Sequence, residues 1–492
     1  MNGLWLLVIP IFGAFLLPTI YKQHELAPKW GVSAILGFSI LITLNLWADV
    51  IKNGAQTMAM GGYPAPLGIV FYIDQFSLLF IMMVLVGTII LRLGKEVAPV
   101  KEDMLTLWLV GASCGLAMSG DLFNIYVFYE IIAIASYGLA GSHGRNASYA
   151  ASLRYLILGT LGSAFALLGI ALIYATTGTL NLSHLSVIGP ELLNTPVGLM
   201  AFTFILIGLG VKAELFPVNT WVPEVYATTS VRTAALLGGI VSKLALLVVV
   251  RLLVLIYADT NAPLLLMTLG ILGVITGEFS ALRATNFRQV LSYSSIGQLG
   301  LIAIAFSIPS TAGIIAGIAL ALHHAVVKSA LFMLAEAWQG HLSKLTGAAH
   351  GSKTSAVMFL ILALSLTGIP PLPGFWAKFL LISAAIQAGN DWYLLAVVAV
   401  MIATVIETAY FIRIARIIFQ KPYEENKTTA IVPQRQELVP ALTLSGLLLI
   451  TTLTIGWIGD GMKTVADQTA DKALYLEQSL PAWQDYKPED FK

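Results

Sequence analysis

The chain has 492 residues, of which 58% are hydrophobic and only 11% are charged, and its formal net charge is +1. A soluble domain carries about 25% charged residues, so this composition excludes an ordinary soluble protein and predicts a polytopic membrane protein. The near-neutral charge also argues against a nucleic-acid partner, because phosphate recognition needs a basic patch.

Cysteine usage excludes several kinds of redox site. Cys114 is the one cysteine, so an internal disulfide cannot form, and the paired-cysteine spacings of iron–sulfur, zinc and covalent haem sites are missing. We therefore expect no cofactor or metal on this chain and assign any redox chemistry to other subunits. The first residues, MNGLWLLVIP, lack the basic leader and cleavage site of a secretory signal, which favours a retained first span.

Apolar runs of about 20 residues, long enough to cross a bilayer, predict an all-α protein with fourteen transmembrane helices. The first seven spans lie near residues 2–20, 30–50, 74–92, 103–119, 121–141, 152–176 and 197–223. The other seven lie near residues 231–257, 262–281, 291–308, 311–335, 355–388, 392–419 and 438–459.

The distribution of lysine and arginine predicts the orientation of these spans. Almost all basic residues in the loops between spans follow odd-numbered spans, whereas the loops after even-numbered spans hold only Lys52. Because cytoplasmic loops collect positive charge, both termini are expected outside the cytoplasm, together with the polar tail from Gly461 to Lys492.

Charged side chains remain inside the predicted spans. The basic ones are Lys212, Lys243, Arg251, Lys328 and Lys378, and the acidic ones are Glu130, Glu214, Glu278 and Glu407, with Asp74 at a span entrance. A lysine at the centre of a bilayer costs roughly 3 kcal/mol on insertion scales, so these groups are expected to be paired or hydrated. An ammonium kept from bulk water can release its proton near neutral pH, which makes the lysines candidate proton-transfer groups.

Prolines interrupt the seventh and twelfth spans beside two of these lysines. Pro217 follows Lys212 in GVKAELFPVNTWVPEVY, and LTGIPPLPGFWAK places three prolines before Lys378. A proline inside a helix removes a backbone hydrogen bond, and carbonyl groups freed at membrane depth are tolerated only where they line protein or water. The two spans are five apart and run in opposite directions, which predicts two inverted five-helix repeats around a hydrated path.

The eleventh span places two histidines near a lysine, in ALHHAVVKSALFML. His324 and Lys328 are four residues apart and share a helix face, so a proton could pass between them directly or through one water. His323 points about 100° away from its neighbour, which makes the two histidines poor joint metal ligands.

These segments resemble the antiporter-like membrane subunits shared by respiratory complex I and Mrp-type cation/proton antiporters. GVKAELFPVNTWVPEVY and GGIVSKLALLVVVRLL look like the seventh and eighth helices of that family. SYSSIGQLG, HHAVVKSALF and LTGIPPLPGFWAK look like its tenth, eleventh and twelfth helices, so the resemblance covers nearly the whole chain. By motif position it implies a mid-membrane row of proton-transfer residues: Glu130, Lys212, Lys243, His324, Lys328 and Lys378.

Three positions depart from complex I members, which usually have proline where Glu214 stands and histidine where Asn219 and Tyr226 stand. Within the family the chain is most similar to the D-type subunits of bacterial Mrp antiporters. The resemblance therefore implies a proton-translocating subunit of a multisubunit Na⁺/H⁺ antiporter in the bacterial plasma membrane. Its implied partners are other membrane subunits, H⁺, Na⁺ or K⁺, and the lipid bilayer.

The same resemblance implies a division of the chain into four parts. The first three helices occupy residues 1–102, the five-helix repeats occupy residues 103–257 and 258–420, and the last helix with its extracytoplasmic tail occupies residues 421–492.

Structural roles for single charges remain as alternatives. Lys212 could be neutralised by Glu130 or Glu214 in a structural ion pair. Lys328 could extend to the cytoplasmic rim, and Glu407 could pair with a loop charge.

Two other functions also remain. One is a pumping subunit of an NADH-quinone oxidoreductase or membrane hydrogenase, which would drive the same row with redox energy. The other is a membrane enzyme that uses His323 or His324 on a lipid substrate.

Overall fold

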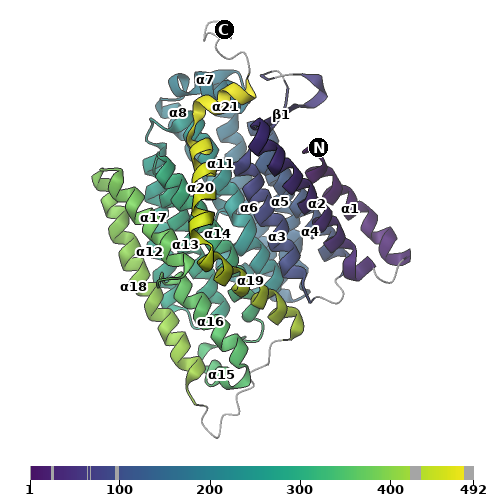
Figure 1. Ribbon diagram of the computed structural model, residues 1–492, viewed down its shortest axis with the longest axis vertical. Coiled ribbons are helices and arrows are strands. Elements are labelled where there is room, and N and C mark those ends of the chain that lie inside the picture. Colours follow the sequence, from purple (N-terminus) through teal and green to yellow (C-terminus); the bar gives the residue numbers. More distant parts are fainter. Residues whose placement is uncertain are drawn as a thin grey trace.

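The computed structural model describes residues 2–23, 27–63, 65–66, 68–94, 99–421 and 434–480. This part of the chain is mostly helical, and its long helices run side by side (Figure 1). A short antiparallel sheet of β1 (Gln56–Ala59) and β2 (Val70–Ile73) lies at one end of the helices, with the 3₁₀ turn η1 (Met60–Gly62) after its first strand.

The predicted spans are present as helices. Spans one to six are α1 (Trp5–Gln23), α2 (Ala27–Asn53), α3 (Gln75–Arg92), α4 (Val100–Met118), α5 (Leu122–Gly141) and α6 (Asn146–Thr177). Spans nine, ten, eleven, thirteen and fourteen are α12 (Ala262–Arg283), α13 (Phe287–Phe306), α14 (Thr311–Leu334), α18 (Asp391–Phe419) and α19 (Arg435–Leu453). Within the described ranges, 11 helices are long and apolar enough to cross a membrane, which confirms a multi-pass membrane protein.

The seventh and twelfth spans are each broken into two helices, as predicted. The seventh consists of α8 (Pro196–Lys212) and α9 (Val222–Thr228), joined by a non-helical segment that contains Pro217. The twelfth consists of α16 (Lys353–Leu366) and α17 (Pro373–Gln387). In the first break Glu214 has a φ of 56°, the one positive φ of a non-glycine residue in the described chain.

The eighth span departs from a regular α-helix, which the sequence did not indicate. It begins as α10 (Val231–Ala234), widens into the π-helical turn η2 (Ala235–Val241), continues as α11 (Ser242–Leu252) and ends in a second π-helical turn, η3 (Leu253–Tyr257). Such turns occur frequently at functional sites. Two glycines in η2 allow close packing there, because a side chain at Gly238 would meet the ring of Tyr226 and one at Gly239 would meet Ser329.

Side-chain caps fix where several spans begin. Asp74 accepts a hydrogen bond from the backbone N–H of Ser77 and completes a capping box at α3. Asp121 accepts hydrogen bonds from the first backbone N–H groups of α5, and Ser310 does the same for α14. These caps satisfy N–H groups that have no partner inside the helix.

Short helices connect or flank the spans at both ends. Between spans six and seven lies α7 (Leu182–Leu192), and between spans eleven and twelve lie the 3₁₀ turn η4 (Leu342–Leu345) and α15 (Ala348–Gly351). Figure 1 shows α7 and α15 at opposite ends of the molecule.

The segment that follows the fourteenth span is helical as far as Ser479. The sequence predicts the fourteenth span over residues 438–459, but α19 ends at Leu453, and α20 (Ile455–Ala470) then runs along α14 and α3. The last helix, α21 (Lys472–Ser479), packs against α7 and β1 (Figure 1). The predicted tail therefore starts as packed helices, and residues 481–492 lie outside the described residues.

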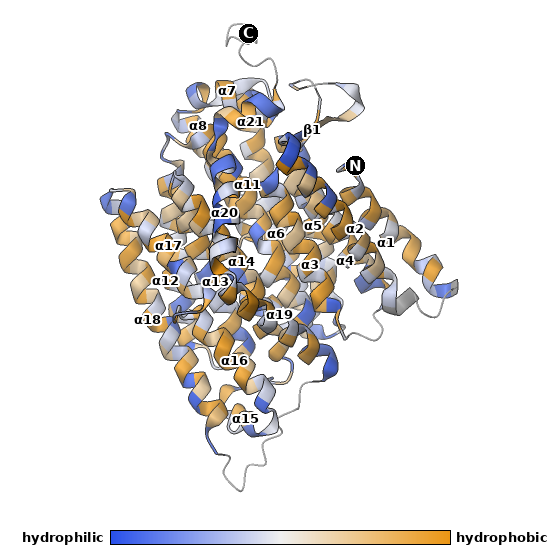
Figure 2. Cartoon of the chain, in the orientation of Figure 1, coloured by the Kyte–Doolittle hydropathy of each residue, from blue (hydrophilic) through white to orange (hydrophobic). Residues whose placement is uncertain are grey.

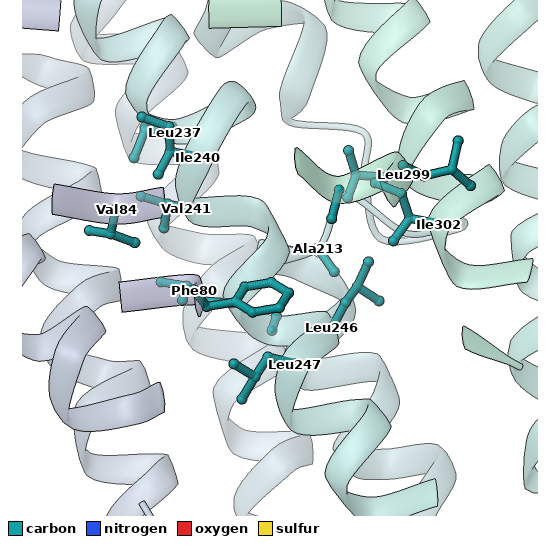
Figure 3. Packing of buried hydrophobic residues seen from close by; sticks show 14 of the residues in the cluster. Phe80, Val84, Ala213, Leu237, Ile240, Val241, Leu246, Leu247, Leu299 and Ile302 are labelled. Carbon is teal, nitrogen blue, oxygen red and sulfur yellow. The ribbon is translucent and has the colours of Figure 1, made fainter. Parts of the chain in front are cut away.

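Hydrophobic residues cover the lengths of the helices, and hydrophilic residues gather toward their ends (Figure 2). The outward faces of α6 and α18 are apolar and exposed, as at Leu161 and Val398, which suits a surface in contact with lipid or other membrane proteins. Inside, Phe80 and Val84 of α3 pack beside Val241 of η2 in one continuous core (Figure 3).

Candidate functional site

Lys212, the last residue of α8, ends among aromatic side chains. Its ammonium donates a hydrogen bond of 2.6 Å to the hydroxyl of Tyr155 on α6. The same nitrogen lies 4.2 Å from the ring centre of Tyr155 and 4.4 Å from that of Tyr137. With 4% of the residue exposed, a hydroxyl and two ring faces hold this cation out of water.

Glu130 of α5 lies near Lys212 without contacting it. The two side chains interact electrostatically, but no ion pair within 4.0 Å joins them. The carboxylate oxygen Oε1 of Glu130 is buried and has no hydrogen-bond partner. This free acceptor beside a lysine that is bound elsewhere fits a pair that can open and close.

Aromatic rings connect the Lys212 site to the break in the seventh span. The ring of Tyr155 stacks on that of Trp221 with the ring centres 3.7 Å apart, and Trp221 meets Tyr226 edge to face. The indole N–H of Trp221 also donates a hydrogen bond of 3.0 Å to the carbonyl of Val211. A backbone carbonyl next to the break is thereby satisfied at membrane depth.

Glu214 lies in the break itself and is fully buried. Its carboxylate accepts a hydrogen bond of 2.8 Å from the hydroxyl of Tyr226 on α9. Its positive φ costs a non-glycine residue roughly 1–2 kcal/mol. Because Glu214 contacts α9 while Lys212 contacts α6, the structural ion pair between these two residues is not formed.

Lys243 stands at the start of α11, directly after the π-helical turn η2, and is fully buried. Its ammonium donates hydrogen bonds to the carbonyl of Gly238 and, over 3.0 Å, to the hydroxyl of Ser242. It interacts electrostatically with Glu214. The wider turn of η2 therefore supplies the carbonyl that holds this lysine.

Lys328 of α14 is fully buried. Its ammonium donates a hydrogen bond of 3.3 Å to the carbonyl of Leu291. It interacts electrostatically with Glu214 in the break of the seventh span, with Glu278 of α12 and with Glu407 of α18. The alternative that Lys328 extends to the cytoplasmic rim is wrong, because no part of it reaches the surface.

The two histidines of α14 have different surroundings, as expected. His324 is fully buried, both its ring nitrogens lack a hydrogen-bond partner, and it lies in the electrostatic field of Lys243 and Lys328. His323 has its Nε2 2.9 Å from the hydroxyl of Ser365, at the end of α16. Among the described residues, no group of three or more His, Cys, Asp or Glu side chains could hold a metal ion.

Lys378 of α17 forms a direct ion pair with Glu407 of α18, with 2.7 Å between Nζ and Oε2. The side-chain amide of Gln298 donates a hydrogen bond of 2.9 Å to the other oxygen of Glu407. The alternative that Glu407 pairs with a loop charge is wrong. The nearby Arg413 instead donates hydrogen bonds to two backbone carbonyls at the end of α12.

Glu278 of α12 is a further buried carboxylate near Lys328 and Lys378. It is 2% exposed and interacts electrostatically with Glu407, Lys328 and Lys378. Tyr410 also interacts with it electrostatically, although the tyrosine hydroxyl donates its hydrogen bond to Ser294 over 2.8 Å.

The structure thus places all six predicted residues inside the helix bundle with three further carboxylates, and all of them except the half-buried Glu130 are buried. We call this set the charge band; it consists of Glu130, Lys212, Glu214, Lys243, His324, Lys328, Glu278, Glu407 and Lys378. Each carboxylate in it interacts with at least one lysine, which offsets part of the cost of burying these charges. Glu214, Glu278 and Glu407 were visible as charges inside spans, but their partners come from helices distant in sequence.

Asp74 and Arg251 form a second buried ion pair outside the charge band, with 2.6 Å between their charged groups. The guanidinium also lies over the rings of Tyr72 and Phe76, and over that of Tyr475 from α21. The pair caps α3 and joins it to the eighth span.

Comparison with known proteins identifies one family across more than half of the chain. Residues 119–404 match the family described as "NADH:quinone oxidoreductase/Mrp antiporter, TM". The D-type subunit of the Na⁺/H⁺ antiporter of Alkalihalophilus pseudofirmus is 31% identical over 98% of this chain and 100% of its own length. The N-type subunit of the NADH-quinone oxidoreductase of Desulforudis audaxviator is 29% identical over 93% of this chain and 95% of its own. A chain of the archaeal membrane-bound sulfane sulfur reductase superposes with a TM-score of 0.88 at 29% identity, over 97% of this chain and 99% of that chain.

Proposed function

The chain belongs to the family of membrane subunits found in NADH:quinone oxidoreductases and Mrp antiporters, and from this membership we propose that it is a proton-translocating subunit of a multisubunit Na⁺/H⁺ antiporter. The observation that carries the proposal is the charge band. Its residues come from the part of the chain between α5 and α18, and its four lysines are all buried. Two of these lysines, Lys212 and Lys378, belong to the broken spans. Ionisable groups kept inside a membrane protein mark ion pathways and proton relays.

In the proposed mechanism, Glu130 and Lys212 act as a switchable pair. When the pair is closed, the carboxylate stabilises the ammonium of Lys212. When it is open, the ammonium keeps only the hydroxyl of Tyr155 and the ring faces around it. An ammonium out of water and without a carboxylate favours its neutral form, so opening the pair releases the proton.

The released proton then moves along the charge band. Lys243 and His324 relay it, Lys328 assists, and Lys378 stands at the far exit, held by Glu407. The two ring nitrogens of His324, both without hydrogen-bond partners, leave it free to accept and donate a proton. Each transfer needs a neighbour within about 3 Å or one bridging water.

The chain is a multi-pass membrane protein, and we place it in a bacterial plasma membrane with both termini outside the cytoplasm. The basic loops after odd-numbered spans support that orientation. We further propose the two repeats at residues 103–257 and 258–420. The proposed partners are other membrane subunits of the antiporter, H⁺, and Na⁺ or K⁺.

Antiport by everted vesicles that carry the assembled complex tests this function. Lys212→Ala should abolish Na⁺-dependent proton movement while the complex still assembles in the membrane. Lys463→Ala, at an exposed lysine of α20, is the matched control and should retain activity. Normal antiport by the Lys212→Ala complex would disprove the proposed role.

A second candidate is a pumping subunit of an NADH-quinone oxidoreductase, favoured by the 29% identity to the N-type subunit of such an enzyme. Purification of the tagged chain decides between the two, because flavin and iron–sulfur subunits would accompany it only in the second case. A lipid-modifying enzyme loses support, since His324 is fully buried and His323 is bound to Ser365.

A further inference from the structure

The junction between the Lys212 site and the Lys243 site is formed by the break in the seventh span. Tyr226 lies against Gly238 of η2, and its hydroxyl donates a hydrogen bond to Glu214. The carbonyl of Gly238 accepts a hydrogen bond from Lys243. Glu214 and Lys243 therefore approach the same turn of the eighth span from two sides.

Ser242 stands between these two charged groups. Its hydroxyl oxygen accepts a hydrogen bond of 3.0 Å from Lys243, and its hydrogen is donated over 3.0 Å to the carbonyl of Gly238. The same hydroxyl lies close enough to the carboxylate of Glu214 to interact with it, but in this conformation it donates its hydrogen to Gly238 instead. A serine hydroxyl has one hydrogen and two lone pairs and can rotate, so it can point to either acceptor.

The Glu214 carboxylate has a place for that hydrogen. Its Oε1 accepts from Tyr226, but its Oε2 is buried and has no hydrogen-bond partner. An unsatisfied carboxylate oxygen in a fully buried position costs free energy, so its presence here calls for a functional explanation.

We propose, on the basis of the antiporter function above, that Ser242 and Glu214 form a one-hydroxyl proton relay for Lys243. The ammonium of Lys243 gives a proton to the oxygen of Ser242 while Ser242 passes its own hydrogen to Oε2 of Glu214. One N–H bond breaks at Lys243, one O–H bond is exchanged at Ser242, and one O–H bond forms at Glu214. The products are a neutral amine and a neutral carboxylic acid, so the step leaves no isolated charge.

The backbone of Glu214 supports a chemical role over a purely structural one. A turn with positive φ favours glycine or asparagine, so a glutamate there is a strained choice if only the shape of the break matters. This backbone conformation places the carboxylate where it interacts with Lys243. The carbonyl of Gly238 competes for the hydrogen of Ser242 and so holds the relay off in this conformation.

A double-mutant cycle in the purified complex, reconstituted into proteoliposomes, tests the relay. Ser242→Ala and Glu214→Gln should each lower cation-dependent proton exchange by about tenfold or more, and the double variant should be no slower than the slower single variant. Ser242→Thr and Glu214→Asp keep the hydroxyl and the carboxylate and should retain more activity than these variants. Losses that multiply in the double variant would overturn the relay.

Infrared difference spectra between alkaline and acidic pH distinguish a relay from a packing role. If Glu214 and Ser242 only fill space, their substitution should leave the C=O band of a protonated carboxylic acid unchanged. The wild-type complex should show a C=O band of a protonated carboxylic acid that disappears in Glu214→Gln and shifts in Ser242→Ala. A band unaffected by Glu214→Gln would contradict the assignment. If Glu214→Gln fails to assemble, the activity and band shift of Ser242→Ala alone decide.

Lys212→Ala in the same liposomes separates this inference from the function on which it rests. If Lys212→Ala exchanges protons normally, the proposed function fails. If Lys212→Ala is inactive while Ser242→Ala and Glu214→Gln are both normal, the function stands and the relay is wrong.

Discussion

The ammonium of Lys212 is bound to the hydroxyl of Tyr155 over 2.6 Å, while the carboxylate of Glu130 stands near without an ion pair. A tyrosine hydroxyl accepts a hydrogen bond from an ammonium and donates one to a neutral amine. Tyr155 can therefore hold the side chain of Lys212 in both protonation states. Glu130, in contrast, stabilises only the charged state, which is what a switch requires.

Tyr155→Phe removes this hydroxyl and keeps the ring that stacks on Trp221. A hydrogen bond to a charged group contributes about 1.5–3 kcal/mol, so we expect proton exchange by the assembled complex to fall by roughly tenfold to a hundredfold. Tyr174→Phe, at an exposed position of the same helix, is the control and should be neutral. Equal activity of the two variants would show that the hydroxyl of Tyr155 has no part in the exchange.

Glu130→Gln should lower exchange more than Glu278→Gln. Among the described residues Glu130 is the carboxylate that acts on Lys212, whereas Lys328 keeps Glu214 and Glu407 after Glu278 is neutralised. We expect a loss of about tenfold or more for Glu130→Gln, measured as antiport rate per assembled complex. Similar losses in both variants would contradict the switchable pair.

Glu407→Gln leaves Lys378 as a buried cation without its carboxylate. Breaking a buried ion pair from one side costs about 3–5 kcal/mol, so thermal unfolding of the purified complex should shift to a lower temperature. The double variant Lys378→Met/Glu407→Leu should recover much of that loss. Glu224→Gln, which breaks the exposed pair with Arg154, is the control and should change stability by about 1 kcal/mol or less. No difference between the buried and exposed pairs would contradict the prediction.

Asp74→Asn breaks another buried ion pair, between Asp74 and Arg251, which lies outside the charge band. We expect a loss of stability of about 3 kcal/mol, as for Glu407→Gln, but an unchanged exchange rate per assembled complex. Thermal unfolding and vesicle antiport, measured on the same samples, test both halves. Loss of exchange in a stable Asp74→Asn complex would mean that this pair belongs to the proton path.

New cysteines can test the proposed orientation, because the single native cysteine, Cys114, is buried. Ser343→Cys lies in an exposed position after the eleventh span, and Asn194→Cys lies in one between the sixth and seventh spans. A membrane-impermeant maleimide added to intact cells should label Asn194→Cys and leave Ser343→Cys unlabelled. Everted vesicles should give the reverse, and the opposite result in both would invert the orientation.

The spans and their breaks could be predicted because they depend on local properties. A run of apolar residues specifies a membrane helix, and Pro217 in the interior of such a run removes a backbone hydrogen bond and favours a break. The partners of the buried charges could not be predicted in the same way. Tyr155 is 57 residues from Lys212, and Glu407 is 29 residues from Lys378, so these contacts arise only when helices pack.

Two further features depend on backbone geometry that residue types do not specify. The sequence of η2 predicts an ordinary apolar helix and gives no sign of a π-helical turn. Its two glycines do indicate the close packing found there. Its position two residues after Lys212 suggests that Glu214 could pair with that lysine, but its positive φ gives it a different set of contacts. Its role therefore emerged from its contacts and could not be inferred from its spacing.

The helix α20 packs on both α14 and α3, which are separated by more than 200 residues of chain. During synthesis, α3 enters the bilayer long before α20 has left the ribosome. The surface that they share must stay occupied by lipid, or by an insertion factor, until translation ends. Folding of this protein is therefore completed only when its last helices pack onto its first ones. Truncation before α20 would expose the surfaces of α14 and α3 that this helix covers.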